Sequence, residues 1–343
     1  MRVMIQSDGP HAHYYIRMGW AKVFSAIGWN VSLWEKDGKS AFDAFDEFEP
    51  TVFMGQTYNL SDAIIKCIKE RPHMKVVMRA SDWGQLNESI DREKYPILKA
   101  SEDEIRLVDR LKRQTGKPDF VHNHYTQKWI EETHGHWREI GVEPVSLIHG
   151  ADVYDYYNGS FDEHLASDVA FVGGYWPYKA KSLDRYMLPI CDEDLNVKIF
   201  GNNWPTPKGL GRLSNERVKD LFFSSVVCPN VSEPHSQDFG YDIIERPFKV
   251  LLSKGFCISD RVQSMEEEVF PDQIVYADNP QDFKEKIHHF VKNPEERQKY
   301  IQKGFLEVLT KHTYFHRVSF ILEKLGFKKE SEQCLSILRD IIS

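Results

Sequence analysis

Short apolar runs alternate with amphipathic stretches along the first half of the chain. The apolar runs predict strands near residues 2–6, 31–34, 51–55, 75–78, 119–121 and 145–148. Stretches with helical spacing separate most of them, including one that begins at Tyr14 and stops before Gly28, and one that begins at Ser61. Strand–helix alternation of this kind predicts a parallel sheet.

The alternation pauses once and then starts again. Residues 152–167 are rich in Tyr, Asp, Asn and Gly without a clear period, which indicates a connection between domains. A helix is predicted over 180–188, and a helical tail runs from Asp282 with a break at Asn293–Pro294. Further strands are predicted at 168–172, 197–200, 225–228, 256–259 and 274–276.

These patterns predict an α/β protein with two Rossmann-like, doubly wound domains that face a cleft. We expect an N-terminal, acceptor-side domain over 1–155 and a C-terminal domain over 165–325. The last helix, 326–343, is expected to pack back on the N-terminal domain. In open parallel sheets the ligand lies beyond the carboxyl ends of the strands, so the residues directly after each strand are the first candidates for chemistry.

Composition fits this organisation. The 343 residues suit two domains, and 41% hydrophobic with 28% charged residues is ordinary for a globular protein. The net charge of -8 argues against non-specific affinity for nucleic acid and leaves a local basic site open. The five cysteines are scattered without a CxxC pair, which favours buried thiols in a reducing compartment. Without an apolar span or a leader we expect a soluble, cytoplasmic protein, and the oligomeric state is not indicated.

A charged segment precedes an apolar run in the second half. Glu245, Arg246 and Lys249 surround Pro247, and Gly255 follows the run. Proline favours the first turn of a helix and glycine the position past its end, so a helix is predicted between them. The N-terminus of a helix suits an anion. The segment indicates either a diphosphate site or a surface helix with ordinary salt bridges.

Glycine and asparagine follow three strands of the second half. Gly173 and Gly174 come directly after one strand and would let a phosphate approach the backbone, unless they form only a tight turn. Lys179 stands just before the next helix and adds a positive charge. Asn202 and Asn230 follow two other strands.

Histidines follow two strands of the first half. His122 and His124 end one strand, and His149 follows the next. Histidine suits proton transfer near neutral pH, whereas the His-x-His spacing also permits a metal site. No carboxylate or cysteine set accompanies them, so we expect no metal. The loop between Ser7 and Tyr14 follows the first strand and could contact acceptor or phosphate, but it lacks the GxGxxG fingerprint.

Five segments of the second half follow one another in a specific order over about 160 residues. They are FVGGYWPYK (171–179), KIFGNNW (198–204), CPNVSEPH (228–235), ERPFKVLLSKGFCISD (245–260) and HTYFHR (312–317). In this order they resemble the group-1 superfamily of glycosyltransferases with GT-B architecture, and within it the CgeB-like branch known from spore maturation. The resemblance implies that the second domain binds a nucleotide sugar. The implied donor contacts are Gly173, Gly174, Lys179, Asn202, Asn230, Glu233, Glu245, Arg246 and Lys249.

One position departs from the family pattern. The family carries an acidic residue near the Arg246-x-Phe248 element that binds the donor ribose. Here Lys249 or Val250 occupies the aligned position, depending on register, and Glu245 is a candidate substitute. The resemblance further implies that Lys179 and Arg246 stabilise the leaving diphosphate without a bound metal.

The first half carries a looser resemblance. VHNHY (121–125) and IHGAD (148–152) resemble segments of retaining transferases of the sucrose-phosphate-synthase kind. The likeness implies that His149 or His124 faces the reacting sugar, with Asp152 as a third catalytic candidate in the same segment.

The resemblance therefore implies a glycosyltransferase, hexosyl- or pentosyl-, that moves a sugar from a nucleotide diphosphate to an acceptor hydroxyl, with retention preferred. We expect a UDP-sugar as co-substrate and no other cofactor. The acceptor stays open: a glycan, a small molecule, a protein or modified DNA. A DNA-base-modifying transferase is an alternative, in which Trp20 and Trp83 would stack a flipped base. A non-catalytic sugar-nucleotide-binding protein and a GT-B-shaped epimerase or phosphorylase are the others, although the phosphate site or cofactor lysine of a phosphorylase is not apparent.

Overall fold

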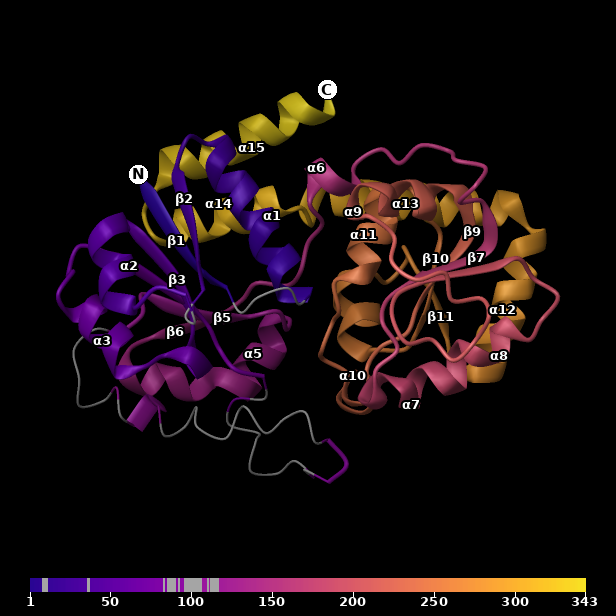
Figure 1. Cartoon of the computed structure of the whole chain (residues 1–343), viewed down its shortest axis with the longest axis horizontal. Coiled ribbons are helices and arrows are strands. Elements are labelled where there is room, and N and C mark those ends of the chain that lie inside the picture. The colour runs from indigo at the N-terminus through magenta and orange to yellow at the C-terminus, as the bar shows by residue number, and fades with distance from the viewer. Residues whose placement is uncertain are drawn as a thin grey trace. The chain divides into compact units, whose positions relative to one another are not determined.

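The computed structural model describes residues 1–7, 12–35, 38–82, 84, 91, 93–95, 107–109, 111 and 117–343. They form two compact units (Figure 1). The first unit comprises Met1–Ile148 and Tyr314–Ser343, and the second comprises His149–Thr313. The chain therefore leaves the first unit once and returns to it.

The first unit is built on a six-stranded parallel sheet in the order β2-β1-β3-β4-β5-β6. The strand order reverses between β1 and β3, and the carboxyl ends at such a reversal are where ligands bind in open α/β sheets. The strands are β1 (Arg2–Ser7), β2 (Asn30–Glu35), β3 (Val52–Gln56), β4 (Lys75–Arg79), β5 (Phe120–Asn123) and β6 (Glu143–Ser146).

Helices cover both faces of this sheet (Figure 1). On one face, apolar side chains of β1, β3, β4 and β5 share a core with Phe45 and Ile64 of two short helices. On the other face, Gly19 lies so close to Tyr314 that an added Cβ would meet the ring at 2.2 Å. The helices are α1 (Ala12–Ala26), α2 (Ala41–Phe48), η1 (Thr57–Asn59), α3 (Asp62–Lys69), α5 (Gln127–His134), η4 (Gly135–Ile140), α14 (Tyr314–Lys324) and α15 (Lys328–Ile342).

The second unit is built on a five-stranded parallel sheet in the order β11-β10-β9-β7-β8. Its strand order reverses between β7 and β9. The strands are β7 (Ser167–Val172), β8 (Val197–Phe200), β9 (Ser225–Asn230), β10 (Cys257–Asp260) and β11 (Val275–Ala277).

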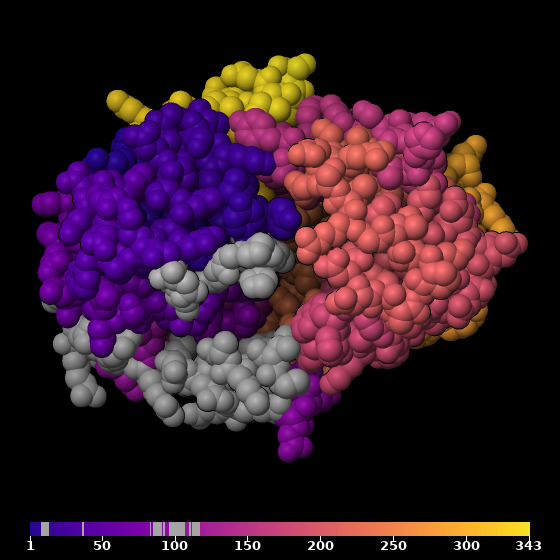
Figure 2. All heavy atoms as spheres, in the orientation of Figure 1, coloured from indigo at the N-terminus to yellow at the C-terminus, as the bar shows by residue number. Residues whose placement is uncertain are grey.

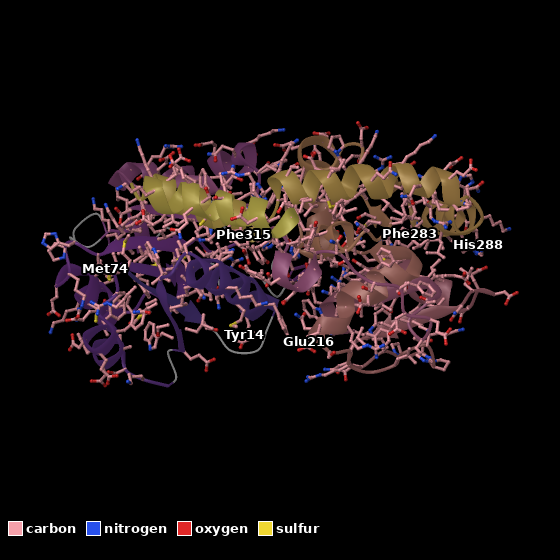
Figure 3. The ribbon with its side chains drawn as sticks, turned by 90° about the horizontal axis from the view of Figure 1, so that it is seen from above. Tyr14, Met74, Glu216, Phe283, His288 and Phe315 are labelled. Atoms are coloured by element: carbon pink, nitrogen blue, oxygen red, sulfur yellow. The ribbon has the colours of Figure 1, made fainter. Side chains whose placement is uncertain are left out.

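Helices flank this sheet as well. Phe283, labelled in Figure 3, packs edge to face on Tyr186 in a core that joins α7, α8 and α12 to one face of the sheet. Leu221 packs on the opposite face against Ala170. The helices are α6 (Val153–Tyr156), α7 (Pro177–Tyr186), α8 (Leu188–Cys191), α9 (Asn215–Ser224), α10 (Pro234–Phe239), α11 (Arg246–Leu252), the π-helical turn η5 (Met265–Val269), α12 (Pro280–Lys292) and α13 (Pro294–Lys311).

The predicted fold class is confirmed, with two Rossmann-like units and strands at all eleven predicted places. The unit boundaries differ from the predicted ones. The first change falls after Ile148 instead of near 155–165, and the second after Thr313 instead of 325. The second difference has a packing cause: Tyr314 already lies against α1 of the first unit, so α14 joins α15 there.

The chain after β8 folds back beside that strand. Ile199 bridges Gly209, and Gly201 bridges Gly211. In Figure 2 this salmon-coloured stretch lies on the face of the second unit that is turned to the viewer. The turn places Asn202 at the carboxyl edge of the sheet, next to the end of β7.

Composition predicts buried cysteine thiols and no apolar segment long enough to span a membrane. All five cysteines are free and buried, which confirms the prediction of buried thiols. In the described part of the chain, no helix combines the length and apolar character needed to cross a membrane.

Candidate functional site

The reversal of strand order in the second unit brings the ends of β7 and β9 together. Val172 ends β7 and is followed by Gly173 and Gly174, while Asn230 ends β9. This is the place where an open α/β sheet offers its ligand site. The residues predicted from the strand-end loops therefore converge on one edge of one sheet.

Arg246 joins these two strand ends. Its Nε donates to the Val172 carbonyl at 3.1 Å, and its Nη1 donates to Asn230 Oδ1 at 3.1 Å and to the Val231 carbonyl at 3.5 Å. The guanidinium lies 4.4 Å above the centre of the Phe171 ring. Its remaining nitrogen, Nη2, donates to none of the residues that the structure describes. A cation with one unused donor group suits an anionic ligand.

Glycine is required beside this arginine. A Cβ on Gly173 would come within 2.9 Å of Arg246 Nη2 and 3.0 Å of the Phe171 ring. Gly201 has a φ of 149°, and a Cβ there would lie 2.0 Å from the Gly173 carbonyl oxygen. Gly174 is not crowded, since the nearest atom to its Cβ would be the Asn202 carbonyl oxygen at 4.0 Å. The turns after β7 and β8 therefore leave backbone, not side chain, around the guanidinium.

Lys179 is buried in the first turn of α7 and pairs with Glu233. Its ammonium lies 2.8 Å from Glu233 Oε1, and it is 5% exposed. Burial lowers the pKa of Lys179, and Glu233 opposes this shift by raising it, while the charge of Arg246 adds to the lowering. The second carboxylate oxygen, Glu233 Oε2, is buried and has no hydrogen-bond partner among the residues that the structure describes. It can accept a hydrogen bond from a hydroxyl group of a ligand.

A fully buried carboxylate lies behind these groups at the end of β10. Asp260 accepts hydrogen bonds from the Ser232 backbone at 3.0 Å, from the hydroxyls of Ser232 and Ser259 at 3.1 and 3.2 Å, and from Gln237 at 2.5 Å. Burial raises the pKa of Asp260, whereas these donors lower it. The sequence reasoning did not select Asp260, although its place as the last residue of an apolar strand was a usable signal.

Lys249 and Glu245 form a separate pair on α11. Their charged groups are 2.5 Å apart, and the Lys249 ammonium lies 5.2 Å from the centre of the Tyr156 ring. Glu245 is the N-cap residue of α11, and its side chain makes no capping hydrogen bond. The helix itself has seven residues, from Arg246 to Leu252. The two residues contact each other and α6, so their predicted role toward a ribose stays a prediction.

A second buried network joins α7 to α10. His235 Nε2 lies 2.8 Å from Asp242 Oδ2, and its Nδ1 lies 2.9 Å from the Tyr178 hydroxyl. Since a carboxylate only accepts, His235 donates from Nε2 to Asp242, and in the neutral ring Nδ1 accepts from the Tyr178 hydroxyl. Tyr178 precedes Lys179 and His235 comes two residues after Glu233, so this network holds both members of the ion pair in place.

The strand-end histidines of the first unit are buried. His122 packs edge to face on Trp20 with 5.6 Å between ring centres, and burial together with the charge of Arg79 lowers its pKa to about 3. His124 is 8% exposed, and its ring centre lies 4.9 Å from that of Tyr125. His122 is thus a neutral core side chain near neutral pH.

The other catalytic candidates lie in the second unit. His149 is its first residue and is half-buried. Asp152 is 4% exposed and caps α6, because its carboxylate accepts a hydrogen bond from the Tyr154 backbone at 3.0 Å. The structure therefore gives Asp152 a local structural task. Their catalytic roles stay predictions.

The structure describes part of what was predicted for Trp20, Trp83 and the loop after the first strand. Trp20 is 9% exposed and packs edge to face on His122, so little of its ring is available to stack on a base. Trp83 and residues 8–11 of the predicted loop lie outside the described residues. Among the residues that are described, no group of three or more His, Cys, Asp or Glu is placed to hold a metal ion.

Part of the chain matches a known protein family by sequence. Residues 182–323, from within α7 to within α14, match a family described as glycosyl transferase-like. A comparison with curated proteins finds no match. The family match covers the ion-pair partner Glu233, the arginine and the buried carboxylate described above.

Solved structures share the fold over nearly the whole chain. Sucrose-phosphate synthase from Thermosynechococcus elongatus is 9% identical, with 98% of this chain and 100% of that chain covered at a TM-score of 0.65. HepE of Anabaena in complex with UDP-glucose is 9% identical, with 95% and 99% covered at 0.61. The DNA-modifying enzyme β-glucosyltransferase is 12% identical, with 97% and 100% covered at 0.58.

At these identities the likeness concerns the fold, which is the GT-B fold of two Rossmann-like units. The domain match and these neighbours together support a glycosyltransferase. None of the comparisons bears on the CgeB-like branch, which stays a prediction.

Proposed function

We propose that this protein transfers a sugar from a nucleotide diphosphate to an acceptor hydroxyl, and that it binds the donor at the carboxyl edge of the second sheet. The observation that carries the proposal is Arg246. It bridges the ends of β7 and β9 at the reversal of strand order and keeps Nη2 without a partner among the described residues. Diphosphate oxygens are the natural partner of such a donor.

The groups around Arg246 suit the rest of a donor. Gly173 leaves the backbone open beside Arg246, so that a phosphate can approach it, as glycine permits. Lys179 adds a positive charge that can stabilise the diphosphate as it leaves. Glu233 Oε2 is a buried acceptor to which no described residue donates, and it can bind a sugar hydroxyl.

We take UDP as the nucleotide, because HepE and phage T4 BGT, two neighbours of the same fold, were solved with UDP-glucose. Retention of the anomeric configuration rests on the likeness of residues 121–125 and 148–152 to retaining transferases. It is tested by the anomeric proton signals of the product in NMR. An inverted product would refute retention and leave the transferase proposal intact.

The direct test is a thermal-shift screen of nucleoside diphosphates and their sugars. A ligand at about 100 times its dissociation constant stabilises by about 2.7 kcal/mol. Arg246→Ala should remove the shift. Lys284→Ala is the matched control, because Lys284 pairs with Glu193 in the same unit without touching Arg246. Equal shifts in the wild type and Arg246→Ala would refute the donor site.

Turnover separates an enzyme from a sugar-nucleotide-binding protein. We expect the wild type to release nucleoside diphosphate from the donor that the screen identifies. His149→Ala should abolish release while donor binding persists, because His149 is assigned to the reacting sugar and not to the nucleotide. Binding without any release, with or without added acceptor sugars, would favour a non-catalytic protein.

A further inference from the structure

A chain of hydrogen bonds runs from the centre of the second unit to the proposed diphosphate contact. It starts at Asp260, which is fully buried and accepts hydrogen bonds from Ser232, Gln237 and Ser259. A carboxylate has acceptors and no proton to give. The Ser259 hydroxyl has one proton, and it goes to Asp260 Oδ1 at 3.2 Å.

Because Ser259 donates its proton to Asp260, its oxygen can only accept a hydrogen bond from Asn230. Asn230 lies 2.8 Å from Ser259 Oγ, and because this oxygen has no second proton, Asn230 must donate through Nδ2. The amide oxygen of Asn230 then faces the other way, toward Arg246 Nη1 at 3.1 Å. A guanidinium only donates, so the contact with Ser259 and the contact with Arg246 require the same orientation of the Asn230 amide.

We infer that Asp260 is a positioning residue for Arg246: through Ser259 it fixes the amide of Asn230 so that the oxygen, not the nitrogen, meets the guanidinium. The inference rests on the proposed function for its ligand, since Arg246 is the proposed diphosphate contact. Asp260 makes no hydrogen bond to Arg246, although burial lowers the pKa of the guanidinium and the charge of Asp260 raises it through space.

The hydrogen bonds from Asp260 through Ser259 prevent the opposite orientation of the Asn230 amide. With the Asn230 amide turned over, Nδ2 would face Nη1, and two donors would meet without an acceptor between them. Arg246 would then be held only by the carbonyls of Val172 and Val231. The guanidinium would lose its hydrogen bond to Asn230, which aligns it. The polar groups of Asn230 and Ser259 would stay buried without hydrogen-bond partners, which is costly inside a protein.

The first experiment measures coupling without any ligand. Ser259→Ala, Arg246→Ala and the double variant are unfolded in urea, and Ser253→Ala is the matched control. Ser253 is also fully buried and donates one hydroxyl hydrogen bond, to the Tyr156 carbonyl, at the far end of α11. We expect the midpoint loss from Ser259→Ala to fall below half when Arg246 is already alanine, and the loss from Ser253→Ala to be equal in both backgrounds.

The second experiment measures UDP affinity by calorimetry. Ser259→Ala should weaken UDP binding about tenfold and Ser253→Ala should stay within twofold, whereas Arg246→Ala, which should abolish binding, serves as the second background in the urea series alone. In that series Asp260→Asn should show the same dependence on Arg246, and Arg246→Lys replaces Arg246→Ala if the latter does not fold. Additive losses in the urea series would overturn the inference, whether or not UDP binds. Coupled midpoints in a protein that binds no nucleotide would support the positioning chain and refute the proposed donor site.

Discussion

The two glycines after β7 offer the sharpest test of the site, because they are neighbours with opposite surroundings. An alanine Cβ at 173 would meet Arg246 Nη2 at 2.9 Å and the Phe171 ring at 3.0 Å, whereas one at 174 would meet nothing closer than 4.0 Å. Neither glycine has a positive φ, so backbone strain does not separate them. The difference between the two variants therefore measures crowding of the guanidinium.

The size of the effect follows from what can move. The Phe171 ring is 0% exposed and held in the core, so Arg246 has to yield. Its hydrogen bonds of 3.1 Å to Val172 and Asn230 would lengthen. Overpacking of a core costs about 1–3 kcal/mol, and a hydrogen bond to a charged group contributes about 1.5–3 kcal/mol. We expect Gly173→Ala to lose about 1–3 kcal/mol of unfolding free energy and about tenfold to hundredfold in UDP affinity.

Urea unfolding and calorimetry with UDP measure the two quantities. Gly174→Ala should stay within about 0.5 kcal/mol of the wild type and should keep its affinity. A Gly174→Ala variant that loses as much affinity as Gly173→Ala would show that the ligand, and not Arg246, needs the open backbone. Full affinity in Gly173→Ala would refute the assignment of Arg246.

Three further predictions concern the fold. Gly201→Ala should cost at least about 2 kcal/mol, because a carbonyl oxygen 2.0 Å away cannot yield, while Gly211→Ala, with a φ of 75° and open space, should cost only about 1–2 kcal/mol. The pKa of His122 is lowered from 6.5 to about 3, so as pH falls below 6.5 only the unfolded state gains the proton. Between pH 7 and 5 the wild type should lose about 2 kcal/mol that His122→Gln does not lose. Gly19→Ala should cost about 1–3 kcal/mol through its clash with a buried ring, and Gly135→Ala, which meets nothing, should be neutral.

Denaturant titrations check all three, and each has its own contrary result. Equal losses at 201 and 211 would mean that φ alone matters there. Parallel pH profiles of the wild type and His122→Gln would mean that His122 is protonated in the folded protein. A neutral Gly19→Ala would mean that α1 and α14 separate without cost.

The strands were predictable because each is a short apolar run bounded by turn residues, as in Val197–Phe200. The boundaries of the two units were harder to predict from the sequence. Residues 314–324 have the same amphipathic helical pattern whichever unit they join, and long-range contacts decide it, such as that of Tyr314 with Gly19 and the ion pair of Lys324 with Glu143. Contacts between residues so distant in sequence leave no periodic signal.

The candidate site was predictable to the extent that its residues follow strands. Gly173, Asn230 and Arg246 were selected for that reason or for their place at a helix start, and the structure joins them. Asp260 was missed because a single carboxylate at the end of an apolar run also suits a solvated turn. Lys249 was selected by its charge, but its pairing with Glu245 follows from helical spacing and removes the need for an external anion.

The return of the chain to the first unit means that the second unit begins and ends at the same place. Ala151 donates to the His312 carbonyl at 2.9 Å and bridges Thr313, and Gly150 lies against the same segment. Adjacent ends are what allow a domain to be excised or its ends to be joined. A fragment of residues 149–313 should fold and bind nucleotide by itself, whereas removal of residues 314–343 should unfold the first unit and spare the donor site.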